Sequence, residues 1–169
     1  MLDEVEKCIV HWQKNFVATE WEKTSTDWED CALCVACSDC RDCPLNGIGE
    51  NCIETGSIYN KARIAQENKN WNDWRRACSE VLDVLRKIRA IMMSIKHWEE
   101  NLELTNKINT SATACALCTE YDGNCRLCPL GDCCTVGSIY DRAHKAYKKW
   151  TVACENMIAK LKELLHESN

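Results

Sequence analysis

A pattern of cysteine pairs occurs twice in this 169-residue chain, in the same order each time. In each occurrence two C-x-x-C pairs, the second followed by Pro, precede a further Cys, with H-W-x-x-N before them and G-S-I-Y after them. Agreement over several blocks in an unchanged order predicts a tandem duplication. Two copies are fewer than the roughly three units that a solenoid needs. We place the first repeat at residues 1–88 and the second at residues 89–169.

Five cysteines recur at matching places in the two repeats. They are Cys31, Cys34, Cys40, Cys43 and Cys52 in the first, and Cys115, Cys118, Cys125, Cys128 and Cys133 in the second. A C-x-x-C turn points two thiolates at one metal, and two such turns supply the four thiolates of a structural zinc site. The pattern therefore predicts two zinc sites, but spacing does not decide which four of the five cysteines in a repeat are ligands. Cys37 and Cys134 have no counterpart, and we set them aside.

An iron–sulfur cluster is the alternative cofactor. Between Cys31 and Cys43 every third residue is a cysteine, and Pro44 follows the last of them. This run resembles the cysteine motif of bacterial ferredoxins. The second repeat lacks the middle cysteine, so zinc fits the two repeats better.

The segments around the cysteines have the apolar periodicity of helices. Apolar residues recur at spacings of three and four over about residues 2–22, which predicts a helix with one buried face. This face consists of Leu2, Val5, Ile9, Trp12 and Phe16. After the cysteines, Ser57 and Ser138 are residues of a type that caps helix N-termini. A last helix is predicted over about residues 138–166.

The segment between the two cysteine clusters has the strongest helical pattern. No Gly or Pro occurs from Ser57 to about Ile108, so one helix could leave the first repeat and enter the second. Its apolar stripe consists of Trp71, Trp74, Cys78, Val81, Leu85, Ile88, Met92 and Ile95. Asn68, Asn70 and Asn72 are poor helix formers, and the segment could bend there or near Arg89. The sequence leaves open whether this helix is continuous or bent.

These patterns together predict an all-α fold. It consists of two tandem helical hairpins, each with a cysteine metal knuckle at its tip, fused through a long shared helical segment. The chain has only two Pro and six Gly, which are too few for the many turns of a sandwich or barrel.

Other residues repeat without belonging to the cysteine pairs. His11 and His97 are each followed, four residues later, by Asn. Histidine is a common zinc ligand, but each repeat already has enough thiolates, so we expect these His and Asn side chains to bind backbone near the knuckle. The remaining cysteines on the predicted helices lie at apolar-face positions, where a free cysteine packs as a small hydrophobe. These are Cys8, Cys78 and Cys154.

The distribution of charge allows two interpretations. The net charge is −5, which does not favour a non-specific nucleic-acid binder. Basic residues nevertheless gather on the helices predicted to leave each cysteine cluster, and acidic residues on those that enter it. Charge-complementary antiparallel helices explain this. The alternative is a basic strip that binds nucleic acid.

The beginning of the chain predicts where the protein works. It is acidic and amphipathic, unlike a secretory signal, and no window of about 18 apolar residues follows anywhere. Fifteen cysteines, an odd number, leave at least one thiol unpaired. We therefore expect a cytoplasmic protein without membrane association, because closely spaced cysteine pairs in a reducing compartment bind metal more often than they form disulfides.

The motifs H-W-x-x-N, C-x-L-C and C-x-x-C-P-L resemble those of small cysteine-rich bacteriophage proteins of unknown function, which usually carry one copy. The resemblance covers each repeat almost fully and implies the cytoplasm of an infected bacterium, but no activity. The chain has no nucleotide-binding loop and no hydrolase or zinc-protease motif, so we expect no enzymatic activity. We expect a zinc-stabilised helical protein that binds and inhibits or redirects a host or phage protein, in counter-defence for example. Its oligomeric state is left open.

Overall fold

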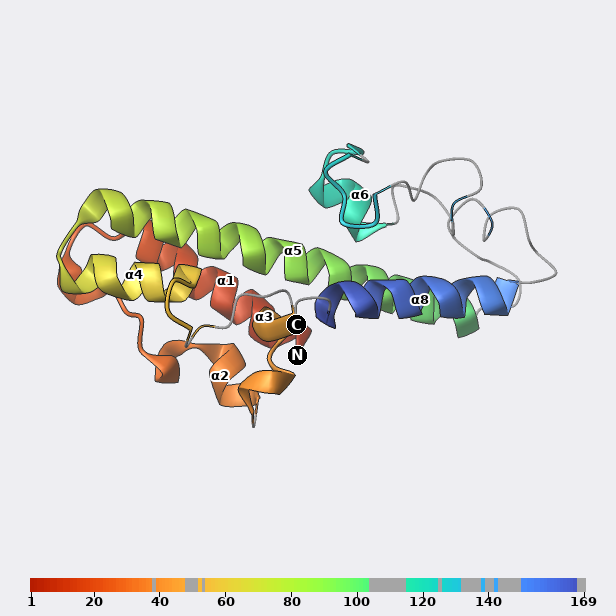
Figure 1. The fold of residues 1–169 in the computed structure, drawn as a ribbon, viewed down its shortest axis with the longest axis horizontal. Coiled ribbons are helices and arrows are strands. Elements are labelled where there is room, and N and C mark those ends of the chain that lie inside the picture. Colours follow the sequence, from red (N-terminus) through yellow and green to blue (C-terminus); the bar gives the residue numbers. More distant parts are fainter. Residues whose placement is uncertain are drawn as a thin grey trace. The chain divides into compact units, whose positions relative to one another are not determined.

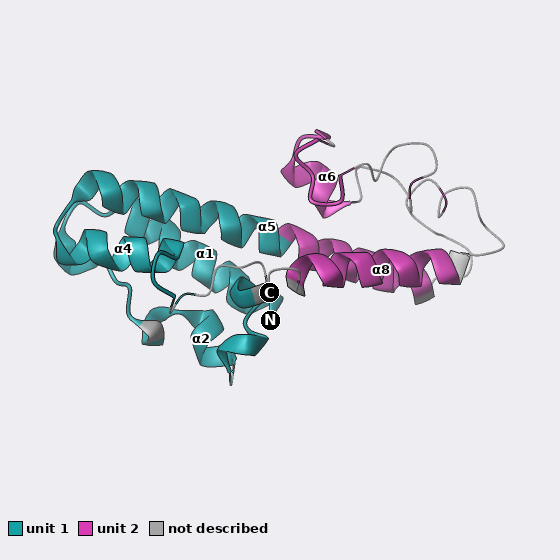
Figure 2. Cartoon of the chain, viewed as in Figure 1, with its two compact units in different colours: residues 1–89, 166–169 teal, residues 90–165 magenta. Residues whose placement is uncertain are grey.

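The structure, a computed structural model, describes the greater part of the chain. The described residues are 1–37, 39–47, 52, 54–103, 115–124, 126–131, 138, 142 and 150–166. They are mostly helical and include no strand, so the predicted all-α class is confirmed. The chain divides into two compact units, residues 1–89 with 166–169, and residues 90–165 (Figure 2). The repeat boundary at residues 88 and 89 rests on sequence matching and stays a prediction.

Unit 1 has three main helices and a cysteine-bearing segment between the first two (Figure 1). The helices are α1 (Leu2–Val17), α4 (Ile58–Glu67) and the first part of α5 (Trp71–Glu103). The segment between α1 and α4 is built from short turns. These are η1 (Trp21–Lys23), η2 (Trp28–Asp30), α2 (Ala32–Ala36), η3 (Cys40–Asp42) and α3 (Pro44–Gly47).

Helix α1 is shorter than the 2–22 range predicted from periodicity. It ends at Val17 because Ala18 adopts an extended backbone, with ψ at 141°. Phe16 was predicted on the buried face, but its side chain is 39% exposed. Asn15 is buried in the last turn instead. Hydrogen bonding to a buried amide, which apolar periodicity does not reveal, therefore decides the end of α1.

A turn between α4 and α5 breaks the long helix considered for residues 57–108. The N–H of Asn70 donates to the carbonyl of Ala65 at 2.9 Å, and the N–H of Lys69 donates to that of Gln66 at 3.0 Å. These two bonds, with Lys69 in the left-handed region at φ 51°, form a Schellman C-cap. The Asn70 side chain then accepts from the N–H of Asn72 and caps α5. The bend therefore lies at two of the asparagines that the sequence marked as weak.

We expect Lys69→Gly to stabilise the protein by about 0.5–1 kcal/mol, because glycine adopts a positive φ without the steric cost that lysine bears. The same substitution at Lys7, an exposed position within α1, should destabilise by about 1 kcal/mol, since φ is helical there. Urea unfolding of both variants measures the two effects. A destabilised Lys69→Gly variant would contradict this account of the turn.

Beyond this turn α5 is continuous from Trp71 to Glu103, so it belongs to both units. The predicted continuation from residue 104 to about 108 lies outside the described residues. Cys78, Val81, Leu85 and Ile88 of the predicted stripe are fully buried. Among the described helices, none combines the length and apolar character that crossing a membrane requires.

The core of unit 1 is centred on two tryptophans. Trp12 of α1 and Trp74 of α5 are buried, with ring centroids 6.1 Å apart. Tyr59 of α4 meets Trp12 edge-on, with the ring centroids 5.1 Å apart. The indole N–H of Trp74 donates to the Asn15 carbonyl at 3.0 Å, and this carbonyl, at the end of α1, also accepts from the N–H of Ala18 at 3.4 Å. All three main helices thus contribute to one aromatic core.

Unit 2 packs the second part of α5 with α6 (Ala116–Glu120) and α8 (Trp150–His166). Its core is an apolar cluster of Ala90, Ile91, Trp98, Cys115, Leu117, Cys128, Cys154, Met157 and Leu161. The predicted helix over 138–166 is described from Trp150 onward, and its predicted inner face is confirmed at Cys154, Met157 and Leu161. Most of residues 139–149 lie outside the described part of the chain.

Candidate metal centre

The first C-x-x-C turn of unit 1 has a geometry that suits a thiolate. Cys31 is the N-cap residue of α2, so its side chain lies beside the free N–H groups at the start of this helix. The backbone groups of Cys34 and Leu33 near this sulfur lower the pKa of Cys31. Leu33 is fully buried and anchors the turn in the core. Backbone amides near the first sulfur favour the thiolate form that a metal-binding C-x-x-C turn uses.

Cys8 of α1 lies directly against this turn. The Sγ atoms of Cys8 and Cys31 are 3.8 Å apart, and both side chains are buried. The hydrogen bond from Cys8, aided by the amide of Cys34 and opposed by burial, lowers the pKa of Cys31 to about 6. The same contact, together with burial, raises the pKa of Cys8. The sequence placed Cys8 in the core as a packing residue, whereas the structure also places it at the thiol cluster.

Three further thiols lie near Cys31. Burial, and then the charge of Cys31, raises the pKa of Cys34. Burial also raises the pKa of Cys52, the charges of Cys40 and Cys31 add to this rise, and a hydrogen bond with Cys34 lowers it. Burial raises the pKa of Cys43 to about 12, and the nearby Cys31 and Cys52 add to this rise. All five predicted ligands of the first repeat therefore belong to one group of interacting thiols, in which Cys40 acts on Cys52.

Cys40 and Cys37 have different positions. Cys40, the fifth predicted ligand, is exposed in η3. Cys37, which has no counterpart in the second repeat, is half-buried, and its thiol interacts with Cys43. Cys40 differs from the buried Cys31 and Cys43 in its exposure, but its charge still raises the pKa values of Cys52 and Cys37.

Tyr59 places a polar group among these sulfurs. Its hydroxyl oxygen is buried and has no hydrogen-bond partner. Burial raises the pKa of Tyr59 well above its ordinary value, and the charges of Cys31, Cys8, Cys52 and Cys43 raise it further. A buried O–H donor without an acceptor is unfavourable, and a thiolate in this cluster would supply the acceptor.

The corresponding cysteines of unit 2 are described in part. Cys115 is the N-cap residue of α6 and is buried, as is Cys128, and Cys118 is half-buried. The other two predicted ligands, Cys125 and Cys133, lie outside the described residues, as does the unmatched Cys134.

Ser94 of α5 makes the contacts in unit 2 that Cys8 makes in unit 1. The Oγ of Ser94 is 3.7 Å from the Sγ of Cys115 and accepts a hydrogen bond from the N–H of Leu117 at 3.3 Å. In unit 1 the backbone of Leu33 likewise lies near Cys8 and acts to lower the pKa of Cys8, against the larger effects that raise it. Ser94 is fully buried. The signal that could have revealed this pairing is that Cys8 precedes His11 by three residues, as Ser94 precedes His97.

The thiols of unit 1 are close together but are not arranged as metal ligands. Within the described parts of the chain, no group of three or more His, Cys, Asp or Glu side chains is placed so that it could hold a metal ion. A metal would have to draw the sulfurs of Cys31, Cys34, Cys43 and Cys52 inward. Metal binding commonly completes its own site in this way.

His11 and Asn15 bind backbone, as expected from the sequence. Asn15 donates from Nδ2 to the carbonyl of Ser25 at 2.7 Å and accepts from the N–H of Ser25 at 3.0 Å. The Nε2 of His11 lies 3.1 Å from the same carbonyl and 3.0 Å from the Asn15 Nδ2. In unit 2 the His97 Nε2 and the Asn101 Nδ2 are 3.1 Å apart. The His11 and Asn15 side chains thus hold the loop that leads from α1 to the cysteines of unit 1.

We expect Asn15→Ala to destabilise the protein by about 1–3 kcal/mol, because it removes the partner of the Ser25 N–H and leaves the Ser25 carbonyl with His11 alone. Asn156→Ala is the control, since Asn156 is exposed on α8. Thermal unfolding of the two variants measures the difference. Equal melting temperatures would show that the Asn15 contacts contribute nothing to stability.

A cavity of about 420 Å³ opens beside the thiols of unit 1. Cys31, Cys34 and Cys52 line one part of it. Its other lining residues are His11, Trp12, Thr26, Asp27, Tyr59, Asn60 and Arg63. Solvent therefore reaches the cluster from this side.

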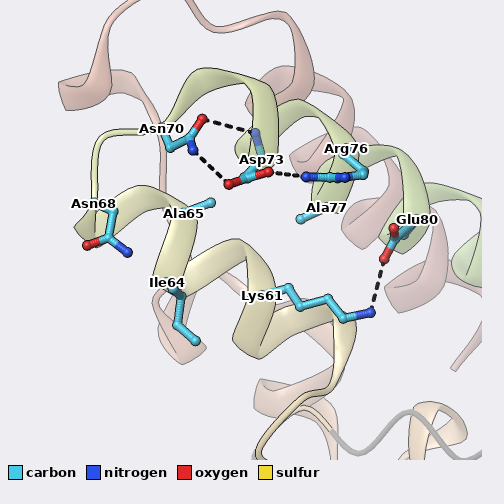
Figure 3. Close-up of a pocket in the computed structure, with 9 residues that line it drawn as sticks. All are labelled: Lys61, Ile64, Ala65, Asn68, Asn70, Asp73, Arg76, Ala77 and Glu80. Carbon is cyan, nitrogen blue, oxygen red and sulfur yellow. Dashed lines mark hydrogen bonds and ion pairs between the residues drawn. The ribbon is translucent and has the colours of Figure 1, made fainter.

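The basic residues of α4 and α5 are largely paired with acidic ones. Figure 3 shows a hollow of about 370 Å³ between these helices, where Lys61 reaches Glu80 at 3.5 Å and Arg76 pairs with Asp73. Further ion pairs join Arg63 to Glu67, Arg86 to Asp83 and, between α5 and α1, Arg89 to Glu6. In unit 2, Lys162 of α8 pairs with Glu99 of α5. Charge complementarity between helices is thus present in both units.

Comparison with known proteins finds no matching family model, no matching curated protein and no matching solved structure. The predicted resemblance to small phage proteins stays a prediction.

Proposed function

We propose that this protein is a zinc-stabilised helical interaction protein without enzymatic activity of its own. In this proposal it works in the cytoplasm of a phage-infected bacterium, where it binds a host or phage protein and inhibits or redirects it. The two cysteine segments are tandem copies of one metal knuckle, and each holds one zinc ion.

The observation that carries the zinc proposal is the gathering of thiols around Tyr59. Cys31 and Cys34 share one turn of unit 1, Cys43 and Cys52 come from later parts of the same segment, and these thiols influence one another's pKa values. Zinc would hold these four as thiolates, and the unpartnered Tyr59 hydroxyl would then have an acceptor. The contact of Cys8 with Cys31, repeated by Ser94 with Cys115, supports a second site of the same kind.

Element analysis of protein purified without oxygen tests this proposal. We expect about two zinc ions per chain, and we expect chelation to lower the melting temperature and the helical circular dichroism together. Metal-free protein with unchanged stability would refute structural zinc. Iron with visible absorption would favour the iron–sulfur alternative, which the position of Cys37 beside Cys43 leaves chemically plausible.

Two features favour a protein partner over nucleic acid. The ion pairs of α4 and α5 occupy basic side chains that a phosphate backbone would need. On α1, Val10 and Val17 lie two turns apart on one face and are 48% and 70% exposed. Exposed apolar side chains at this spacing suit a partner helix or groove.

Affinity capture with a matched pair of variants tests the partner. We expect the Val10→Asp, Val17→Asp double variant to lose a protein that the wild type retains, and Val152→Asp, on an exposed position of α8, to keep it. Capture of nucleic acid that is released steeply by salt would overturn the proposal in favour of a nucleic-acid binder. If the wild type and both variants capture the partner equally, the exposed face of α1 is not the binding surface.

A further inference from the structure

Cys8 and Cys31 are placed to react with each other. Their sulfurs are 3.8 Å apart, and a disulfide bond brings two sulfurs to about 2.05 Å. The two residues are 23 positions apart and are held by different elements, α1 and the N-cap of α2. Packing of the adjacent Ile9 and Leu33 in the core keeps the two elements together. A modest movement of the two side chains would bring the sulfurs from contact to the distance of a disulfide bond.

A small oxidant can reach one member of the pair. Cys31 is itself 8% exposed, and it lines the cavity of about 420 Å³ together with Cys34 and Cys52. Cys8 is 1% exposed and does not line the cavity. An oxidant in the cavity therefore reaches the Cys31 sulfur first. The buried Cys8 sulfur can then react with the oxidised Cys31.

Unit 2 carries an internal control. Ser94 occupies the place of Cys8, with its Oγ 3.7 Å from the sulfur of Cys115 and bonded to the N–H of Leu117. A serine hydroxyl keeps the hydrogen bonding of this position but cannot form a disulfide. At this position the first cluster therefore has an oxidisable thiol and the second does not.

We propose that Cys8 and Cys31 form an intramolecular disulfide when the protein meets hydrogen peroxide. The Cys31 sulfur attacks one peroxide oxygen, the O–O bond breaks, and the other oxygen leaves as water with the Cys31 proton. The sulfenic acid formed on Cys31 is then attacked by the Cys8 sulfur. The S–S bond forms as the hydroxyl leaves with the Cys8 proton as a second water. Two thiols lose two electrons in all, and one peroxide becomes two waters.

The consequence for metal rests on the proposed zinc function. Oxidation of Cys31 removes one thiolate from the unit 1 site, because only a thiolate binds zinc. Unit 2, which has Ser94 in place of a second thiol, keeps its site under the same treatment. Peroxide would thus release the metal of one repeat and spare that of the other.

The experiment treats the full chain with about one equivalent of hydrogen peroxide, blocks free thiols, and maps disulfides by mass spectrometry of non-reduced peptides. Zinc released to a chromogenic chelator is counted in parallel. We expect the peptide of Cys8 linked to that of Cys31 as the main product, and release of about half of the bound zinc. Cys8→Ser should abolish both the Cys8–Cys31 link and the release of zinc. Ser94, at the corresponding place in unit 2, shows that the fold accommodates a serine there.

Ser94→Cys supplies the opposite test. The thiol introduced at position 94 should become linked to Cys115 and make the second site sensitive to peroxide as well. A main product that links Cys31 to Cys34, or oxidation that Cys8→Ser leaves unchanged, would overturn the inference. If the protein contains no zinc but the Cys8–Cys31 link forms, the zinc proposal fails and the disulfide pair stands. If zinc is present and the link does not form, only the pair is refuted.

Discussion

Replacing Trp74 with alanine is expected to destabilise the protein by about 3–5 kcal/mol, the range for a large aromatic side chain removed from a core. Trp74 is fully buried, lies against Trp12, and donates from its indole nitrogen to the Asn15 carbonyl. The substitution therefore removes packing for two helices and the shorter of the two hydrogen bonds that the Asn15 carbonyl accepts. A loss of this size is comparable with the whole stability of a small domain, so we expect much of the protein to be unfolded near 37 °C.

Two further variants separate packing from hydrogen bonding. Trp74→Phe keeps an aromatic ring but lacks the N–H donor, and its loss should be smaller than that of the alanine variant. Val17→Ala alters an exposed side chain on α1 and should change stability by less than about 0.5 kcal/mol. Urea unfolding followed by circular dichroism measures all three. A Trp74→Ala variant as stable as Val17→Ala would contradict the described core.

The second large effect concerns the metal. Cys43→Ser is expected to lower the zinc content from about two ions per chain to about one, because a structural zinc site needs four protein ligands. Cys40→Ser, in the same C-x-x-C pair, should leave the content near two. The structure distinguishes them because Cys43 is buried beside Cys31 and Cys52 whereas Cys40 is exposed.

Element analysis and melting temperature of the two variants check this prediction. Cys43→Ser should also melt at a lower temperature, whereas Cys40→Ser should melt like the wild type. If Cys40→Ser loses zinc and Cys43→Ser does not, the exposed cysteine is the ligand and the thiols rearrange around the metal. Loss of zinc from both variants would show that both cysteines of this C-x-x-C pair are ligands, as the spacing predicts.

Helical periodicity predicted much of the fold because it depends on local geometry. The stripe from Trp74 to Ile88 is buried as its three-and-four spacing requires. Ser57 caps α4, accepting from the N–H of Asn60 at 3.2 Å. The asparagines at residues 68 and 70 flank the turn, because asparagine both weakens a helix interior and caps the next helix through its side chain.

Periodicity failed where a long-range contact overrides a local preference. Phe16 fits the apolar stripe of α1 but is partly exposed, because Asn15 takes the buried place and binds Ser25. Cys8 fits the stripe as a small apolar residue, and only its contact with Cys31 shows that it belongs to the thiol cluster. Neither outcome is encoded in the spacing of residues along one helix.

By itself the sequence determined the all-α class, the positions of most described helices and the set of cysteines to consider as ligands. These depend on periodicity, capping residues and motif spacing, all of which act within a few residues. The tertiary structure decided which thiols meet: Cys31, Cys34, Cys43 and Cys52 interact, Cys40 is exposed, and Cys8 joins from α1. The reason is that contacts between segments many residues apart depend on how helices pack, and no local pattern specifies that packing.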